Sequence, residues 1–218
     1  MITSQHTTEF LQQRADQSPR ISAAEAALSR RSVRKFTDAP VSEEFVQQLL
    51  TLVGRAPSAF NVQPWRFVVV RDPALRQALQ GAAYNQPQVG NAPVVIAIYS
   101  DMEDALAHVE EIVNPGLDAA KTADTVAMLR RTFGGMTDEA RAVWGNAQAN
   151  IALGYLLLLA ETEGLATSPM LGFQPDQVKD ILNIPASATV TALIALGWPD
   201  EEGYASHRHD IQRVASFR

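Results

Sequence analysis

Residues 30–36 (RRSVRKF) carry four cationic side chains within six positions. In an extended chain alternate side chains share one side, which places Arg30, Ser32 and Arg34 together. Two guanidinium groups and a hydroxyl on one side suit a phosphate monoester, because each planar guanidinium can donate two parallel hydrogen bonds to it. A solvated run of charge and a localisation signal are the alternatives that this segment leaves open.

A second polar segment, residues 56–65 (APSAFNVQPW), lies between a predicted helix and a predicted strand. Two prolines stiffen it, and such a loop can bind the edge of a heteroaromatic ring while Phe60 or Trp65 covers one ring face. An ordinary helix-to-strand turn with Trp65 in the core is the alternative. Its hydrogen-bonding side chains are Ser58, Asn61 and Gln63.

The order and spacing of the two segments, RxSxR followed some 25 residues later by PSxxNxQPW and an apolar strand, resemble the FMN-dependent nitroreductase family. The closest likeness is to its small bacterial NAD(P)H-dependent branch. The resemblance extends over about residues 25–215. It includes residues 83–88 (AYNQPQ), the helix with Gln148 and Asn150, the turn at 168–173 (SPMLGF) and a basic C-terminal tail.

This resemblance implies a role for each matching residue around FMN. The phosphate is held by the cationic segment and Arg208, the residue 57–61 loop comes from the other subunit, and the backbone of Leu171 and Gly172 supports flavin N5. Asn85 and Gln88 match contacts to the polar edge of the ring. The implied cofactor set is Arg30, Arg31, Ser32, Arg34, Pro57, Ser58, Ala59, Asn61, Gln63, Asn85, Gln88, Gln148, Pro169, Met170, Leu171, Gly172 and Arg208, with Phe60 and Tyr84 in the substrate pocket.

The implied reaction passes hydride from NADPH or NADH to FMN, and then to a small-molecule acceptor such as a nitroaromatic or a quinone, in ping-pong order. No dedicated catalytic side chain is implied, which agrees with a chain that has no cysteine. A flavin-binding sensor or carrier without turnover, a specialised family reaction such as reductive dehalogenation or flavin destruction, and a soluble interaction domain are the alternatives.

Two positions depart from well-known family members. Gln88 stands where many have Lys, and Leu171 stands where many have Glu before the glycine. Reduced flavin is anionic at its pyrimidine end, so losing the lysine charge there predicts a lower reduction potential.

Composition excludes several classes of protein. The chain has 218 residues and a net charge of −6, which argues against a nucleic-acid surface. The four histidines (His6, His108, His207 and His209) show no metal-site spacing, so no metal is expected. The first 22 residues lack a targeting pattern, and the apolar run at 151–160 is half of the roughly 20 residues that a membrane span needs. We therefore expect a cytoplasmic protein that binds no membrane.

The apolar patterns predict helices at 22–30, 43–55 and 140–163, and strands at 66–71, 93–100, 166–168 and 189–197. The predicted fold class is α+β: one domain over 1–218, with a mostly antiparallel central sheet flanked by helices. The resemblance implies an intertwined homodimer, and the nearly all-round apolar run at 151–160 also predicts cover by a partner subunit. Residues 1–21 are expected to form an arm or helix, 101–137 a solvated helical hairpin or a mobile lid, and 199–218 a C-terminal extension.

Overall fold

The computed structural model describes residues 21–218, so the expected arm or helix at 1–21 lies outside the described residues except for its last position. The strands are β1 (Trp65–Val70), β2 (Val94–Ser100), β3 (Ala166–Met170) and β4 (Thr189–Gly197). The helices are α2 (Ala23–Ser29), α3 (Glu43–Val53), α4 (Pro73–Ala82), α5 (Pro87–Asn91), α6 (Met102–Ala107), α7 (Ala119–Gly134), α8 (Asp138–Thr162), α9 (Pro175–Leu182) and α10 (Ile211–Val214), with 3-10 turns η1 (Ala59–Asn61) and η2 (Val109–Ile112).

The four strands form one sheet in the order β1-β2-β4-β3, and every neighbouring pair is antiparallel. This confirms the predicted α+β class. β3 runs two residues further than predicted because it accommodates Pro169, which has no N–H to donate. Among the four strands of this sheet β3 is an edge strand, and the only strand it pairs with is β4; an edge position tolerates proline.

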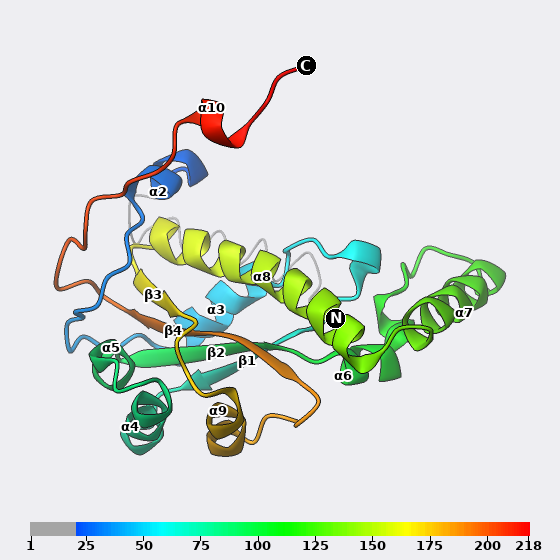
Figure 1. The fold of residues 1–218 in the computed structure, drawn as a ribbon, viewed down its shortest axis with the longest axis horizontal. Coiled ribbons are helices and arrows are strands. Elements are labelled where there is room, and N and C mark those ends of the chain that lie inside the picture. The colour runs from blue at the N-terminus through cyan, green and yellow to red at the C-terminus, as the bar shows by residue number, and fades with distance from the viewer. Residues whose placement is uncertain (1–20) are drawn as a thin grey trace.

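Helices cover both faces of the sheet (Figure 1). Alternate residues of β2 contribute to two separate cores: Val94, Ile96 and Ile98 pack toward α3 and α8, whereas Val95 and Ala97 pack toward α4, α5 and α9. The continuously apolar sequences of β2 and β4 had predicted a sheet covered on both sides, and the structure confirms this.

Helix α8 is the longest element and crosses one face of the sheet (Figure 1). It begins at Asp138, where the Thr137 side chain accepts a hydrogen bond from the Ala140 N–H at 3.2 Å. Within one chain it is not buried on every side, since Val143, Ile151 and Tyr155 are exposed. Cover by a partner subunit therefore stays a prediction.

Residues 101–137 form a helical excursion of α6, η2 and α7 at one end of α8 (Figure 1). It has a small core of its own, centred on Leu129 and Phe133, which also includes Val62 and packs against Trp144. The excursion is therefore a packed helical unit docked beside the 57–63 loop. Among residues 21–218, none of the helices has the length and apolar character needed to cross a bilayer, and no acidic or histidine cluster is arranged to hold a metal.

Candidate functional site

The cationic segment follows the end of α2 and lies against β3. Ser32 bridges Thr167 in parallel, and the Val33 N–H donates to the Thr167 carbonyl at 3.1 Å. Two buried polar atoms here, Arg30 Nη1 and Thr167 Oγ1, have no hydrogen-bond partner within the described part of the chain. A buried donor without a partner is costly, so these atoms fit an anion that completes the site.

Arg31 and Arg34 serve different contacts. Arg31 Nη1 donates to the carbonyls of Leu28 and Ser29 at 2.7 Å each, which fastens the end of α2. The Arg34 guanidinium lies over the Tyr204 ring at 5.9 Å from its centroid, and its backbone N–H donates to Glu201 Oε1 at 2.7 Å. Arg31 therefore contacts the end of α2, whereas Arg34 contacts the C-terminal segment; that Arg30, Ser32 and Arg34 share one side stays a prediction.

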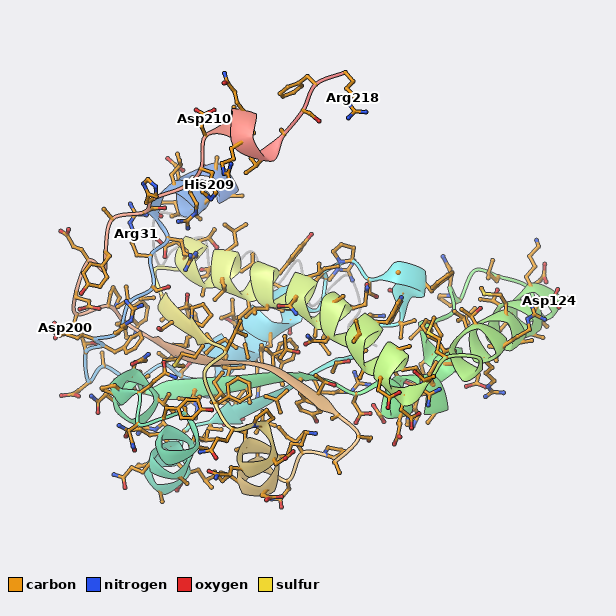
Figure 2. The ribbon with its side chains drawn as sticks, viewed as in Figure 1. Arg31, Asp124, Asp200, His209, Asp210 and Arg218 are labelled. Atoms are coloured by element: carbon orange, nitrogen blue, oxygen red, sulfur yellow. The ribbon has the colours of Figure 1, made fainter. Side chains whose placement is uncertain are left out.

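A cavity of about 640 Å³ opens beside this segment and is lined by Arg34, Lys35, Gln88 and Gly203, among others. Gly203 has a φ of +70°, and a Cβ there would lie 2.9 Å from the Arg31 Cβ, so only glycine allows the C-terminal segment to approach this closely. Beyond it the chain continues past α2, and Figure 2 marks His209, Asp210 and Arg218 along this tail. Arg208 lies in the tail with an exposed side chain, and its Nη1 donates to the His207 carbonyl.

The polar loop at 57–63 is held by its own side chains and by two other elements. Ser58 Oγ accepts from the Gln63 N–H at 3.0 Å, and Gln148 Oε1 accepts from the Ala59 N–H at 2.9 Å. Asn61 Nδ2 donates to the Ile112 carbonyl of η2 at 3.0 Å. Phe60 is 55% exposed, whereas Trp65 is buried, so Trp65 takes the core position that the alternative interpretation had suggested.

Arg66 joins this loop to α6. Its Nη1 donates to the carbonyls of Gln63 and Trp65, and its Nε and Nη2 both donate to Asp104 Oδ2. The hydrogen bonds from Arg66 hold the pKa of Asp104 below its usual value. The hydrogen bond between His108 Nδ1 and the Asp104 carbonyl, together with the Asp104 charge, raises the pKa of His108. The charge network therefore anchors the helical excursion beside the loop.

The segment at 83–88 is tied to the turn that follows β3. The Gln174 N–H donates to the Ala82 carbonyl at 2.8 Å, and Gln86 Nε2 donates to the Gly172 carbonyl at 2.8 Å. Met170 is buried in the core, and Leu171 is 75% exposed on the turn. Tyr84 lies in the 83–88 segment and is 64% exposed.

Backbone strain gathers at the predicted loops. Within residues 21–218 six non-glycine residues have positive φ. Five of them lie in the segments 56–65 and 83–88, which were assigned from the sequence to the cofactor and substrate site, and the sixth, Asn183, ends α9. Such conformations are costly and collect at binding and active sites. The five are Phe60, Asn61, Gln63, Tyr84 and Asn85.

The middle of α8 and its C-terminal end contact different parts of the predicted site. Gln148 contacts the polar loop, whereas Glu161 Oε1 accepts from Ser29 Oγ at 2.7 Å, just before the cationic segment. Thirteen positions of helix separate these contacts, or roughly 20 Å at 1.5 Å per residue. One chain therefore does not bring the polar loop and the cationic segment together.

Three residues that position the site were not assigned from the sequence. Gln86 and Glu201 bond backbone groups distant in the chain, and Arg66 joins β1 to α6. Gln86 lies inside a segment that the resemblance includes, but its partner Gly172 becomes visible only in the folded chain. Conversely, Gln148, expected at the cofactor, uses its side-chain oxygen to hold the loop.

The chain is similar in sequence and in fold to known proteins. NADH dehydrogenase of Thermus thermophilus is 48% identical over 200 residues, covering 92% of this chain and 98% of that protein. A protein of Exiguobacterium sibiricum solved in complex with FMN has a TM-score of 0.84 at 27% identity, covering 92% of this chain and 99% of its own. A nitroreductase family protein of Streptococcus pneumoniae has a TM-score of 0.80 at 25% identity, covering 90% and 100%. Because the family model described as "Nitroreductase family" also matches residues 27–198, the chain belongs to the nitroreductase family.

Proposed function

We propose that the protein is an FMN-dependent oxidoreductase that passes hydride from NADH or NADPH to small electron acceptors such as nitroaromatics or quinones. The observation that carries this proposal is the buried, unpartnered Arg30 Nη1 beside β3. The names of the relatives support it: one is an NADH dehydrogenase and another was solved with FMN. When bound, FMN would supply two-electron hydride exchange, which no side chain of a cysteine-free chain can supply.

The residues of this chain would hold and orient the cofactor. Arg30 Nη1 and Thr167 Oγ1 have free hydrogen-bonding capacity for its phosphate, and Arg34 adds positive charge at the neighbouring cavity. The Leu171–Gly172 turn, fixed by Gln86, would present backbone N–H groups to the reacting edge. Phe60 and Tyr84 would offer exposed aromatic surface to the nicotinamide donor and to the electron acceptor. These two molecules would use one pocket in turn.

The proposed site is shared by two copies of the chain. The separation of roughly 20 Å along α8 keeps the polar loop away from the cationic segment of the same chain, so a second copy would supply the missing half. Two exposed apolar surfaces support a homodimer: Ile151 and Tyr155 on α8, and Ile211, Val214 and Phe217 on the C-terminal tail.

A purification and two assays test the proposal. The purified protein should show an oxidised-flavin spectrum, and the cofactor released by denaturation should chromatograph as FMN. Steady consumption of NADH or NADPH with an added quinone separates an enzyme from a flavin-binding sensor or carrier. Colourless protein that takes up no added FMN would exclude the flavin-dependent function, and FAD in place of FMN would contradict the single-phosphate site.

A further inference from the structure

The side chains of Gln86, Gln88 and Met170 form a hydrogen-bonded network next to the cavity that Arg34 lines. Gln86 Nε2 donates to the Gly172 carbonyl at 2.8 Å, and Gln88 Nε2 donates to Gln86 Oε1 at 3.3 Å and to Met170 Sδ at 3.4 Å. Gln88 is 6% exposed and lines the cavity. A carboxamide next to a cofactor can present either its oxygen or its NH₂ group, and the two choices have opposite electrostatic effects.

The hydrogen bonds remove this ambiguity one step at a time. A backbone carbonyl can only accept, so Gln86 must turn its NH₂ group toward Gly172. Its oxygen therefore faces Gln88. Because that oxygen can also only accept, Gln88 must turn its NH₂ group toward Gln86, where the Met170 sulfur is a second, weak acceptor.

The Gln88 oxygen then lies on the opposite side of the carboxamide. No donor within residues 21–218 bonds it, and it is not among the buried atoms left without a partner, so it keeps accessible surface on a residue that lines the cavity. The orientation of Gln88 is thus set by a carbonyl two residues beyond β3, through Gln86.

We infer that Gln86 is a positioning residue that fixes Gln88 with its carbonyl oxygen toward the cofactor, and that this orientation lowers the reduction potential of the bound flavin. The inference rests on the proposed function. Two-electron reduction adds negative charge to the pyrimidine end of the flavin, and a carbonyl oxygen facing that end opposes this charge, whereas an NH₂ group would stabilise it. The absence of a lysine charge at position 88 and the fixed orientation of Gln88 both lower the reduction potential of the flavin.

Anaerobic redox titration of the FMN-loaded protein tests this inference with a double-mutant cycle. Gln86→Met releases Gln88, which can then turn its NH₂ group to the flavin. We expect reduced FMN to bind about tenfold more tightly relative to oxidised FMN, which raises the midpoint of a two-electron couple by about 30 mV. In a Gln88→Met background Gln86→Met should cause no shift. Gln177→Met is the matched control, because it removes an exposed carboxamide hydrogen bond between Gln177 of α9 and Gln174, the residue before that helix.

The outcomes separate the inference from the proposed function. An unchanged midpoint in Gln86→Met, or an equal shift with and without Gln88, would overturn the positioning role while FMN binding still stands. If the wild type takes up no FMN, the proposed function itself fails.

A flavin-free measurement tests the orientation directly. In the NMR spectrum of the apoprotein we expect an Overhauser effect between the Gln88 side-chain NH₂ and the Met170 methyl group, and its loss in Gln86→Met. Absence of that signal in a folded wild type would overturn the inference.

Discussion

Gln148 accepts a hydrogen bond from the Ala59 N–H at 2.9 Å, so a side chain from the middle of the long helix α8 holds the backbone of the polar loop. The loop contains Phe60 and Asn61 with φ of +55° and +58°, which an unsupported chain adopts only at a cost. The helix therefore contributes to the site by stabilising a strained backbone.

Replacing Gln148 by Met should loosen this loop without unfolding α8, since methionine has similar length and good helix propensity. The lost hydrogen bond, worth about 0.5 to 1.5 kcal/mol, predicts FMN binding that is weaker by about 2- to 13-fold. Fluorescence titration of the apoprotein with FMN measures this. Gln177→Met is the control, and equal affinity in the two variants would remove the supporting role of Gln148.

Arg30→Met should weaken FMN binding more strongly. It removes the buried donor that has no partner in the described chain, and loss of a hydrogen bond to a charged group costs about 1.5 to 3 kcal/mol, or about 10- to 150-fold in affinity. Arg130→Met removes the same charge from an exposed ion pair with Glu110 and should leave affinity unchanged. Wild-type flavin content in dilute Arg30→Met protein would count against the phosphate assignment.

The Asp104 network predicts a pH dependence of stability. The folded pKa of Asp104 is lowered from 3.8, so its contribution is present above that value and is lost as pH falls through the folded pKa. The folded pKa of His108 is raised from 6.5, so its contribution is complete below 6.5 and is lost as pH rises through the folded pKa. The network is thus strongest in mildly acidic solution.

We therefore expect Asp104→Asn to lower the Tm most between these two values and progressively less toward either side. Thermal unfolding of wild type and variant across this pH range measures the difference. Glu110→Gln, which breaks an exposed ion pair on the same excursion, is the control. A Tm difference that does not vary with pH would show that charge on Asp104 does not support the excursion.

Two helical glycines give a matched pair of stability tests. A Cβ on Gly145 of α8 would lie 2.3 Å from Ser100 Oγ and 2.6 Å from Met102 Cγ, so Gly145→Ala should destabilise the fold by about 1 to 3 kcal/mol. A Cβ on Gly81 of α4 meets nothing within 4 Å, and Gly81→Ala should stabilise by about 1 kcal/mol. Urea unfolding of both variants checks the opposite signs, and matching signs would contradict this packing.

The elements were predictable where the hydrophobic pattern is strong. β4 has the predicted bounds, and the central apolar strands correctly predicted a sheet covered on both faces. β3 was predicted two residues too short, because it contains Pro169 and a proline usually ends a strand. Proline is tolerated in a strand at the edge of a sheet, and whether a strand lies at an edge is known only once the sheet has formed.

The sequence predicted which segments form the candidate site, but it did not predict which residues contact one another there. The cationic and polar segments show unpartnered buried groups or backbone strain, as a binding site requires. The partner of Gln86, the role of Arg31 at the end of α2, and the spacing along α8 depend on residues far apart in the chain. Spacing in the sequence does not contain that information.

Coexpression of two defective variants tests whether the FMN site is built from two chains. One variant is Arg30→Met. The other is Ser58→Ala/Asn61→Gly, in which glycine accepts the positive φ at position 61. In a heterodimer, one site carries both defects and the other carries neither. If half of the dimers are heterodimers, about one quarter of wild-type FMN content and activity should return. No recovery, with subunit mixing confirmed, would place both segments at one chain's site and contradict the shared site.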